Sequence, residues 1–386
     1  MSQPYAPEAR LALRIVHAAS LLTKSVLRTL KNNVTAETKA DSSPVTIADF
    51  AAQALIISAL HAVYPSDAFL GEESASQLRE NGELAERVWA LVQHASDQFS
   101  DVQHVWTHRG SGAEDAVANA EADVDAPLRF PASKEEMLDV IDRGMGEQTK
   151  EGRVWVMDPV DGTATFMTGN QYAVCLCLLV DGVQQVGVIG SPNLSFSPQS
   201  PLGATRIHED SVDDTGYGVV LSALKGYGTY VRSMHANGLG EPRRVLHAQS
   251  TKSVRDLDFV EATIGKTSLS QQEHRAVAEA LGAKWPGTVI WSQQMKYVAL
   301  TLGATDVMLR LPKGTDRYTQ IWDHAGGQLL FQEAGGVIKD IDGSDIDFSQ
   351  GRRIEGTRNF GMVASMPPDF DEVNRAVKEV LGRRTS

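Results

Sequence analysis

The sequence predicts an α/β protein in which helices and β-sheets form layers. Stretches with the apolar period of helices open the chain. Short apolar runs rich in Val and Leu follow, and two of them are separated by Asp181-Gly182, a dipeptide that favours a tight hairpin turn. Helix-like and strand-like stretches then alternate in the second half. With 386 residues, 42% of them hydrophobic, the chain can bury the core of two domains or of one large layered unit.

The first half is predicted to combine long helices with a run of strands. An acidic stretch at 110–126 has little apolar periodicity, which predicts a mobile surface loop or an insertion. The other expected elements are, in chain order, helices over 7–31 and 46–63, a short strand over 69–71, a helix near 84–99, a further stretch over 127–143, and strands over 153–158, 172–180 and 183–189.

A Pro-rich and Ser-rich passage at 191–203 is the expected junction between two halves of the chain, residues 1–200 and residues 201–386. The first half should carry most of the candidate metal ligands described below. The elements expected in the second half are strands over 216–221 and 225–231, helices over 270–281 and 294–302, a strand over 306–311 and a helix over 322–334.

Composition excludes several classes of protein. A net charge of −13 without a basic tract argues against binding to nucleic-acid polymers or acidic membranes. No targeting segment or membrane span is expected, so we predict a cytoplasmic protein. Cys175 and Cys177 alternate with Leu176 and Leu178, so both cysteines point to one face of a predicted strand. This favours a core position over a disulfide or a metal pair.

The most informative motif is Asp158-Pro159-Val160-Asp161-Gly162-Thr163, which follows an apolar run. Pro159 biases Asp158 away from helix, so the strand is expected to stop there. Asp158, the Val160 carbonyl and Asp161 then offer three oxygens, a ligand type that suits Mg²⁺. The Gly162 and Thr163 amides are expected at a helix N-terminus, which favours phosphate. Taken alone, the motif is equally compatible with a loop between two core strands.

Three further acidic positions occur where predicted elements begin or end. Glu72 follows the strand-like Ala68-Phe69-Leu70, Asp323 lies at an expected helix start, and Asp49 lies where an extended segment becomes a helix. Each one alone is more often a helix cap or a solvated end than a ligand. Their occurrence together with the Asp158 motif favours a common site.

The chain resembles the inositol monophosphatase superfamily of lithium-sensitive, magnesium-dependent phosphatases in the residues and the order of these motifs. Within that superfamily it most closely resembles the 3'(2'),5'-bisphosphate nucleotidases. The resemblance implies an αβαβα arrangement of two stacked halves, with the active site between them and two or three Mg²⁺ ions bound there. The matching stretches are 18–23 with 43–53, 71–74, 155–163 with 171–178, and 296–336.

The resemblance also implies roles for single residues. Glu72, Asp158 and the Val160 carbonyl would bind one Mg²⁺, and Asp158, Asp161 and Asp323 a second. Asp49 and Thr163 would share a hydrogen bond and take a proton from the attacking water. The substrate-binding residues would be Gly162, Thr163, Lys296, Arg310 and Asp323, with Lys296 and Arg310 holding a second, non-reacting phosphate.

These roles imply a small-molecule substrate, adenosine 3',5'-bisphosphate, cleaved to AMP and phosphate, and also 3'-phosphoadenylyl sulfate. Three departures from the nucleotidase pattern, at Ala164, Thr267 and Gln293, favour instead an inositol phosphate, a sugar phosphate or a specialised metabolite. A non-catalytic metal- or nucleotide-binding relative is a third possibility, which the intact acidic positions oppose. The protein is expected to be a monomer or homodimer.

Overall fold

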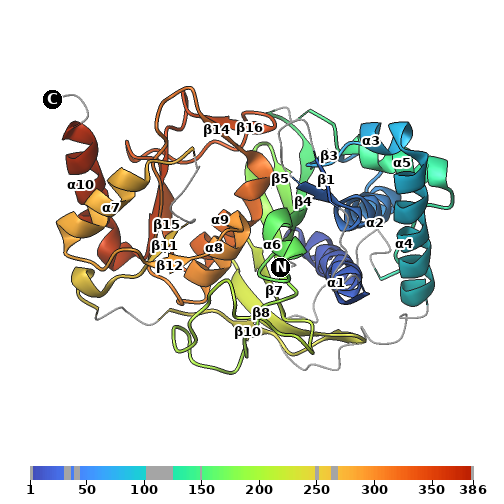
Figure 1. The fold of residues 1–386 in the computed structure, drawn as a ribbon, viewed down its shortest axis with the longest axis horizontal. Helices are drawn as coiled ribbons and strands as arrows, with labels where there is room; N and C mark the ends of the chain where they lie inside the picture. Colours follow the sequence, from blue (N-terminus) through green and yellow to red (C-terminus); the bar gives the residue numbers. More distant parts are fainter. Residues whose placement is uncertain are drawn as a thin grey trace.

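A layer of helices covers one face of the largest sheet. The computed structural model describes residues 3–29, 36–38, 44–100, 125–147, 150–247, 252–261 and 268–383. Helix α2 is the central member of this layer, and almost all of it is buried because α1, α4, α5 and strand β4 surround it. Its run of small Ala side chains permits this close packing. Figure 1 shows these helices on the right. The helices are α1 (Ala6–Thr29), α2 (Ile47–Val63), α3 (Ser76–Glu80), α4 (Gly82–Ser100) and α5 (Lys134–Arg143).

The largest sheet runs in the order β10-β8-β7-β6-β5-β4-β3, with β9 paired to β8. Among the described strands of this sheet, β3 and β4 pair in parallel and the other neighbours pair antiparallel. β4 and β5 are apolar on both faces because helices cover both sides, so they lack the alternation of a half-exposed strand. The strands are β3 (Ala68–Gly71), β4 (Arg153–Asp161), β5 (Ala173–Val180), β6 (Val183–Ser191), β7 (Val219–Leu224), β8 (Gly228–His235), β9 (Gly238–Leu239) and β10 (Arg243–Arg244).

Two helices separate this sheet from a smaller one. Helices α8 and α9 lie between the sheets, and α7 and α10 cover the outer face of the small sheet, whose order is β12-β11-β13-β17-β15 (Figure 1). The five layers are therefore α, β, α, β and α, which confirms the predicted fold class. The elements are β11 (Phe259–Glu261), α7 (Gln271–Leu281), β12 (Thr288–Val289), α8 (Gln293–Thr301), β13 (Val307–Arg310), α9 (Ala325–Glu333), β15 (Val337–Lys339), β17 (Met362–Ser365) and α10 (Pro367–Gly382).

Short elements complete the molecule at the edges of these layers. β14 and β16 form an antiparallel pair. β14 is followed directly by a 3₁₀ turn, η3, that carries Asp323. A second antiparallel pair, β1–β2, precedes α2. These elements are α6 (Thr163–Met167), β14 (Tyr318–Gln320), η3 (Ile321–Asp323), β16 (Arg353–Glu355), β1 (Ala36–Thr38), β2 (Pro44–Thr46) and the 3₁₀ turn η2 (Val254–Asp256).

The predicted hairpin turn and the core position of the two cysteines are confirmed. Asp181 and Gly182 both adopt positive φ, 52° and 76°, as the tight turn between β5 and β6 requires. Cys175 and Cys177 are buried and unbridged in the described structure. The part of the chain that the structure describes contains no helix with the length and apolarity needed to cross a bilayer.

Other predictions need correction. β4 does not stop at Asp158 but continues to Asp161, because a bulge accommodates Pro159. β7 begins at Val219, later than expected. β8 begins at Gly228, because residues 225–227 form the turn between the two strands. Asp323 ends η3 instead of opening α9.

Two predictions stay open. Of the acidic stretch at 110–126, residues 110–124 lie outside the described residues. The division of the chain near residue 200 stays a prediction, and the large sheet takes strands from both sides of it.

Candidate metal and phosphate site

The end of β4 is built around a bulge that places two carboxylates on one side. Along β5, Cys175 pairs with Asp158 and Ala173 pairs with Asp161, so β4 holds one extra residue in this stretch. In a regular strand, residues three apart point to opposite faces, and the extra residue reverses this relation. Asp158 and Asp161 can therefore reach the same point. Proline is tolerated at a bulge because it has no N–H to donate to the ladder.

The turn after the bulge depends on a glycine. Gly162 has a φ of 94°, in the left-handed region, and a Cβ there would lie 2.8 Å from the Thr165 hydroxyl oxygen. The Thr163 hydroxyl donates to the Val160 carbonyl at 3.2 Å, and the Asp158 carboxylate accepts from the Val160 N–H at 3.1 Å. These local hydrogen bonds therefore fix the turn that the motif predicts.

Asp161 is held by the N-terminus of α8. Its carboxylate accepts from the Ser292 hydroxyl, from the Gln294 N–H at 2.6 Å and from the Gln293 N–H at 3.3 Å. Ser292 is also the N-cap of α8, because its side chain accepts from the Met295 N–H. The helix dipole and these donors stabilise the negative charge of Asp161. Sequence analysis missed Ser292, although a serine before a helical stretch is a typical capping signal.

The third carboxylate comes from the other half of the chain. Ligand oxygens of Asp158, Asp161 and Asp323 all lie within 4.8 Å of one another. Asp323 is held by the Thr319 hydroxyl, which donates to it at 3.4 Å. The fold therefore brings these three predicted ligands together.

The electrostatics of this cluster fit a hard cation. Burial, followed by repulsion from neighbouring carboxylates, raises the pKa of Asp158 well above its ordinary value and raises the pKa of Asp323 to about 8. Burial also raises the pKa of Asp161. A divalent cation bound among these carboxylates would offset their repulsion, and carboxylate oxygens are ligands that such cations prefer.

Glu72 and Asp49 lie near the three carboxylates. Repulsion from both contributes to the raised pKa of Asp158. Glu72 follows β3, the strand that pairs with β4, and Asp49 is buried in the first turn of α2. The predicted Asp49–Thr163 hydrogen bond stays a prediction. The Thr163 hydroxyl donates to the Val160 carbonyl at 3.2 Å.

Gln53 lies on α2, the helix that carries Asp49, and is hydrogen-bonded to the backbone segment that carries Glu72. Its amide exchanges two hydrogen bonds with the Glu73 backbone, at 3.0 and 2.7 Å, and donates to the Ile141 carbonyl at 3.0 Å. Gln53 is completely buried, so these bonds are protected from water. They fix the backbone beside Glu72.

Replacing Gly71 by alanine should disturb this arrangement. A Cβ at Gly71 would lie 2.4 Å from the Gln53 carboxamide oxygen, which cannot move without losing its bonds. We expect a loss of about 1–3 kcal/mol in the free energy of unfolding, measured by urea denaturation. Gly82→Ala is the control because a Cβ there meets nothing within 4 Å. Equal stability of the Gly71 and Gly82 variants would contradict the role given to Gln53.

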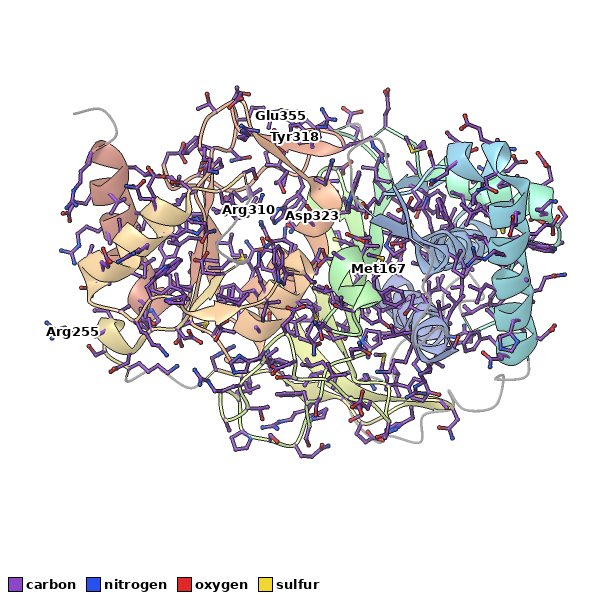
Figure 2. All side chains as sticks on the ribbon, in the orientation of Figure 1. Met167, Arg255, Arg310, Tyr318, Asp323 and Glu355 are labelled. Carbon is purple, nitrogen blue, oxygen red and sulfur yellow. The ribbon has the colours of Figure 1, made fainter. Side chains whose placement is uncertain are left out.

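A buried lysine and a partly buried arginine lie beside the carboxylates. Lys296 on α8 is 5% exposed, and Arg310 ends β13. Both donate to the side-chain oxygen of Gln293, at 3.4 and 3.2 Å, and Arg310 lies within electrostatic reach of Asp323. Figure 2 shows Arg310 and Asp323 near the centre of the molecule. Burial lowers the pKa of Lys296 to about 8 and lowers that of Arg310.

The three departures from the nucleotidase pattern lie in different surroundings. Gln293 is buried between the two cations, and Ala164 is exposed on α6. Thr267 lies outside the described residues. Arg352, which sequence analysis also missed, contacts the backbone next to Glu72 through its guanidinium.

Comparisons with known proteins agree with this geometry. The family model described as "Inositol monophosphatase family" matches residues 6–91 and 110–368. A 3'(2'),5'-bisphosphate nucleotidase of Emericella nidulans is 38% identical over 380 residues, 98% of this chain and 99% of that protein. One of Schizosaccharomyces pombe is 36% identical over 97% of this chain and 96% of that protein.

Solved structures agree on the fold. An inositol monophosphatase of Thermotoga maritima superposes with a TM-score of 0.54 at 14% identity, covering 96% of this chain and 97% of that one. The extragenic suppressor protein suhB of Bartonella henselae superposes with a TM-score of 0.56 at 16% identity, covering 95% and 97%. From its five layers, its acidic motifs and these similarities, the chain belongs to the inositol monophosphatase family.

Proposed function

We propose that this protein is a Mg²⁺-dependent phosphomonoesterase that hydrolyses the 3'-phosphate of adenosine 3',5'-bisphosphate to AMP and phosphate, and that also accepts 3'-phosphoadenylyl sulfate. The observation that carries the proposal is the juxtaposition of three carboxylates from both halves of the chain, two of them buried, with the buried Lys296 and the partly buried Arg310. Relatives that are similar over nearly the whole chain bear the name of this activity.

The carboxylates would hold the metal ions. Glu72, Asp158 and the Val160 carbonyl would hold one ion. Asp158, Asp161 and Asp323, whose oxygens lie within 4.8 Å of one another, would hold a second. Bound Mg²⁺ would supply an activated water and stabilise the leaving oxygen. Cations bound by these residues would offset their negative charge, which would let a dianionic phosphate approach a protein with a net charge of −13.

Other residues would orient the reactants. The Gly162 and Thr163 amides at the start of α6 would bind oxygens of the reacting phosphate. Asp49, buried at the start of α2, would act with Thr163 as the general base for the attacking water. A water and a phosphorus atom held between these groups would suit an in-line displacement.

The cations would select a substrate with a second anionic group. Arg310 offers a planar fork of donors and Lys296 a point charge, and both now share a neutral oxygen of Gln293. A phosphate in place of the Gln293 oxygen would neutralise both positive charges, whereas the neutral amide oxygen of Gln293 only solvates them. If the Gln293 oxygen instead keeps its hydrogen bonds to Lys296 and Arg310, these cations do not bind a second phosphate. Gln293 then favours the alternative substrate class.

A panel of phosphate-release assays tests the proposal. Adenosine 3',5'-bisphosphate, AMP and inositol 1-phosphate should be compared with and without Mg²⁺ and Li⁺. Mg²⁺-dependent release that is fastest from the bisphosphate, with Li⁺ inhibition, is the expected result. A preference for inositol 1-phosphate would assign the chain to the alternative substrate class, and release from none of them would favour the non-catalytic alternative.

The pH dependence of substrate discrimination should follow Lys296. Its pKa is lowered to about 8, so the amine becomes neutral as the pH rises through that value and the second phosphate loses a partner. The ratio of KM for the bisphosphate to KM for inositol 1-phosphate should therefore rise between pH 7 and 9. In Lys296→Arg the charge persists, so the ratio should stay flat. A flat ratio in the unaltered protein would separate Lys296 from the second phosphate.

The cytoplasmic location and the monomeric or homodimeric state remain predictions that these assays do not address.

A further inference from the structure

Arg352 contacts both halves of the candidate site. Its guanidinium donates to the Gly71 carbonyl at 2.6 Å and to the Gly144 carbonyl at 2.9 Å. The same group lies over the Trp322 ring, 4.8 Å from the ring centroid. Its backbone carbonyl accepts from the Ile321 N–H at 3.0 Å. One residue immediately before β16 therefore touches β3, the segment after α5, and η3.

These contacts lie next to two of the proposed metal ligands. Gly71 immediately precedes Glu72, and Trp322 immediately precedes Asp323. The two ligands are more than two hundred residues apart in sequence and belong to different halves, so nothing in the local chain relates their positions. The Arg352 side chain spans the backbone of one and the ring beside the other.

The chemistry of arginine suits this task. The guanidinium is planar, so its edge can donate to two carbonyls while its face stacks on an indole. A lysine amine lacks the flat face and the fork. The positive charge also lies within electrostatic reach of Glu72, where it offsets part of the repulsion among the carboxylates.

We propose that Arg352 is a positioning residue that brings Glu72 and Asp323 into one divalent-cation site. This inference rests on the proposed function, because it assumes that these carboxylates bind metal ions. Arg352 touches neither substrate nor the reacting atoms in this arrangement. Its effect is on the relative placement of two ligands, so metal affinity should respond to its loss more than the fold does.

A direct metal-binding experiment tests the inference. Mn²⁺ is titrated calorimetrically into the full-length protein and the variants Arg352→Met and Arg352→Lys, and the Mg²⁺-induced rise in Tm is measured for each. Both variants should bind Mn²⁺ roughly 10–100-fold more weakly, as is typical when a residue that orients metal ligands is lost. Their Tm should gain less from Mg²⁺ than that of the unaltered protein.

Arg353→Met is the matched control. Arg353 is the neighbouring residue on β16, is exposed, and lies over Tyr318 at 4.0 Å instead of over Trp322. It should keep the unaltered Mn²⁺ affinity. If Arg352→Met does not fold, Arg352→Lys, which keeps the charge, decides the result.

Two failures can be told apart. Unchanged Mn²⁺ affinity in a folded Arg352 variant would overturn the inference and leave the proposed function standing. Absence of Mn²⁺ and Mg²⁺ binding by the unaltered protein would overturn the proposed function itself, and the inference with it.

Discussion

Replacing Asp158 by asparagine is expected to lower kcat by more than roughly 100-fold, a loss above about 2.7 kcal/mol of transition-state stabilisation. Asp158 is the carboxylate that would contact both cations, and an amide keeps its shape but removes the charge. Phosphate release from adenosine 3',5'-bisphosphate at saturating Mg²⁺ measures the effect. Near-unaltered turnover in this variant would be incompatible with a two-metal mechanism.

The same substitution should stabilise the metal-free protein. Burial, together with repulsion from Glu72, Asp161 and Asp323, raises the pKa of Asp158 in the fold. An acid whose pKa is raised on folding binds more protons folded than unfolded, so its contribution to stability is lost as the pH rises above the unfolded value. The gain in Tm of Asp158→Asn over the unaltered protein should therefore grow from pH 5 to pH 8 when metal is absent.

Addition of Mg²⁺ should reverse this order. The cation would stabilise the unaltered protein, whose carboxylates it neutralises, more than the variant. Asp139→Asn is the control, since Asp139 lies at the surface and pairs with Arg79. A gain in metal-free Tm combined with a loss of turnover separates a functional carboxylate from a residue that merely packs.

The acidic motif around Asp158 could be predicted because its signals are local. An apolar run, a proline and an Asp-Gly pair determine a turn at the end of a strand without reference to the rest of the chain. The predicted end of β4 was wrong because the bulge depends on how β5 pairs with it. That register is a property of two strands, and the β4 sequence alone does not contain it.

Asp323 and Arg352 show where prediction ends. Asp323 was expected at a helix start, but it lies in a 3₁₀ turn between β14 and α9, where the Thr319 hydroxyl of β14 donates to it. The partners of Arg352 are carbonyls of glycines and a tryptophan ring, and no pattern of side chains in the sequence marks them. Contacts between side chains and distant backbone therefore have to come from the fold.

Gln293 shows the same limit for substrate preference. Sequence comparison with the nucleotidase pattern identifies it as a departure, but its hydrogen bonds to Lys296 and Arg310 depend on how α8 packs against β13. The two cations are thus held together by a neutral oxygen before any substrate binds. This arrangement makes Arg310 the most informative position for the nature of the substrate.

Arg310→Ala is expected to raise KM for adenosine 3',5'-bisphosphate by roughly 100-fold, because removal of one partner of a buried charge-assisted pair typically costs about 2–5 kcal/mol. KM for inositol 1-phosphate, which has no second phosphate, should change far less. Steady-state kinetics with both substrates measure the difference.

Leu309→Ala is a matched control on the same strand. Leu309 is buried in the apolar core beyond the small sheet, so its loss should lower stability without separating the two substrates. Equal effects of Arg310→Ala on both KM values would instead place Arg310 beside the reacting phosphate or beside Asp323. The hypothesis of a second-phosphate site would then be wrong. The alternative substrate class would become the better explanation for Lys296 and Arg310.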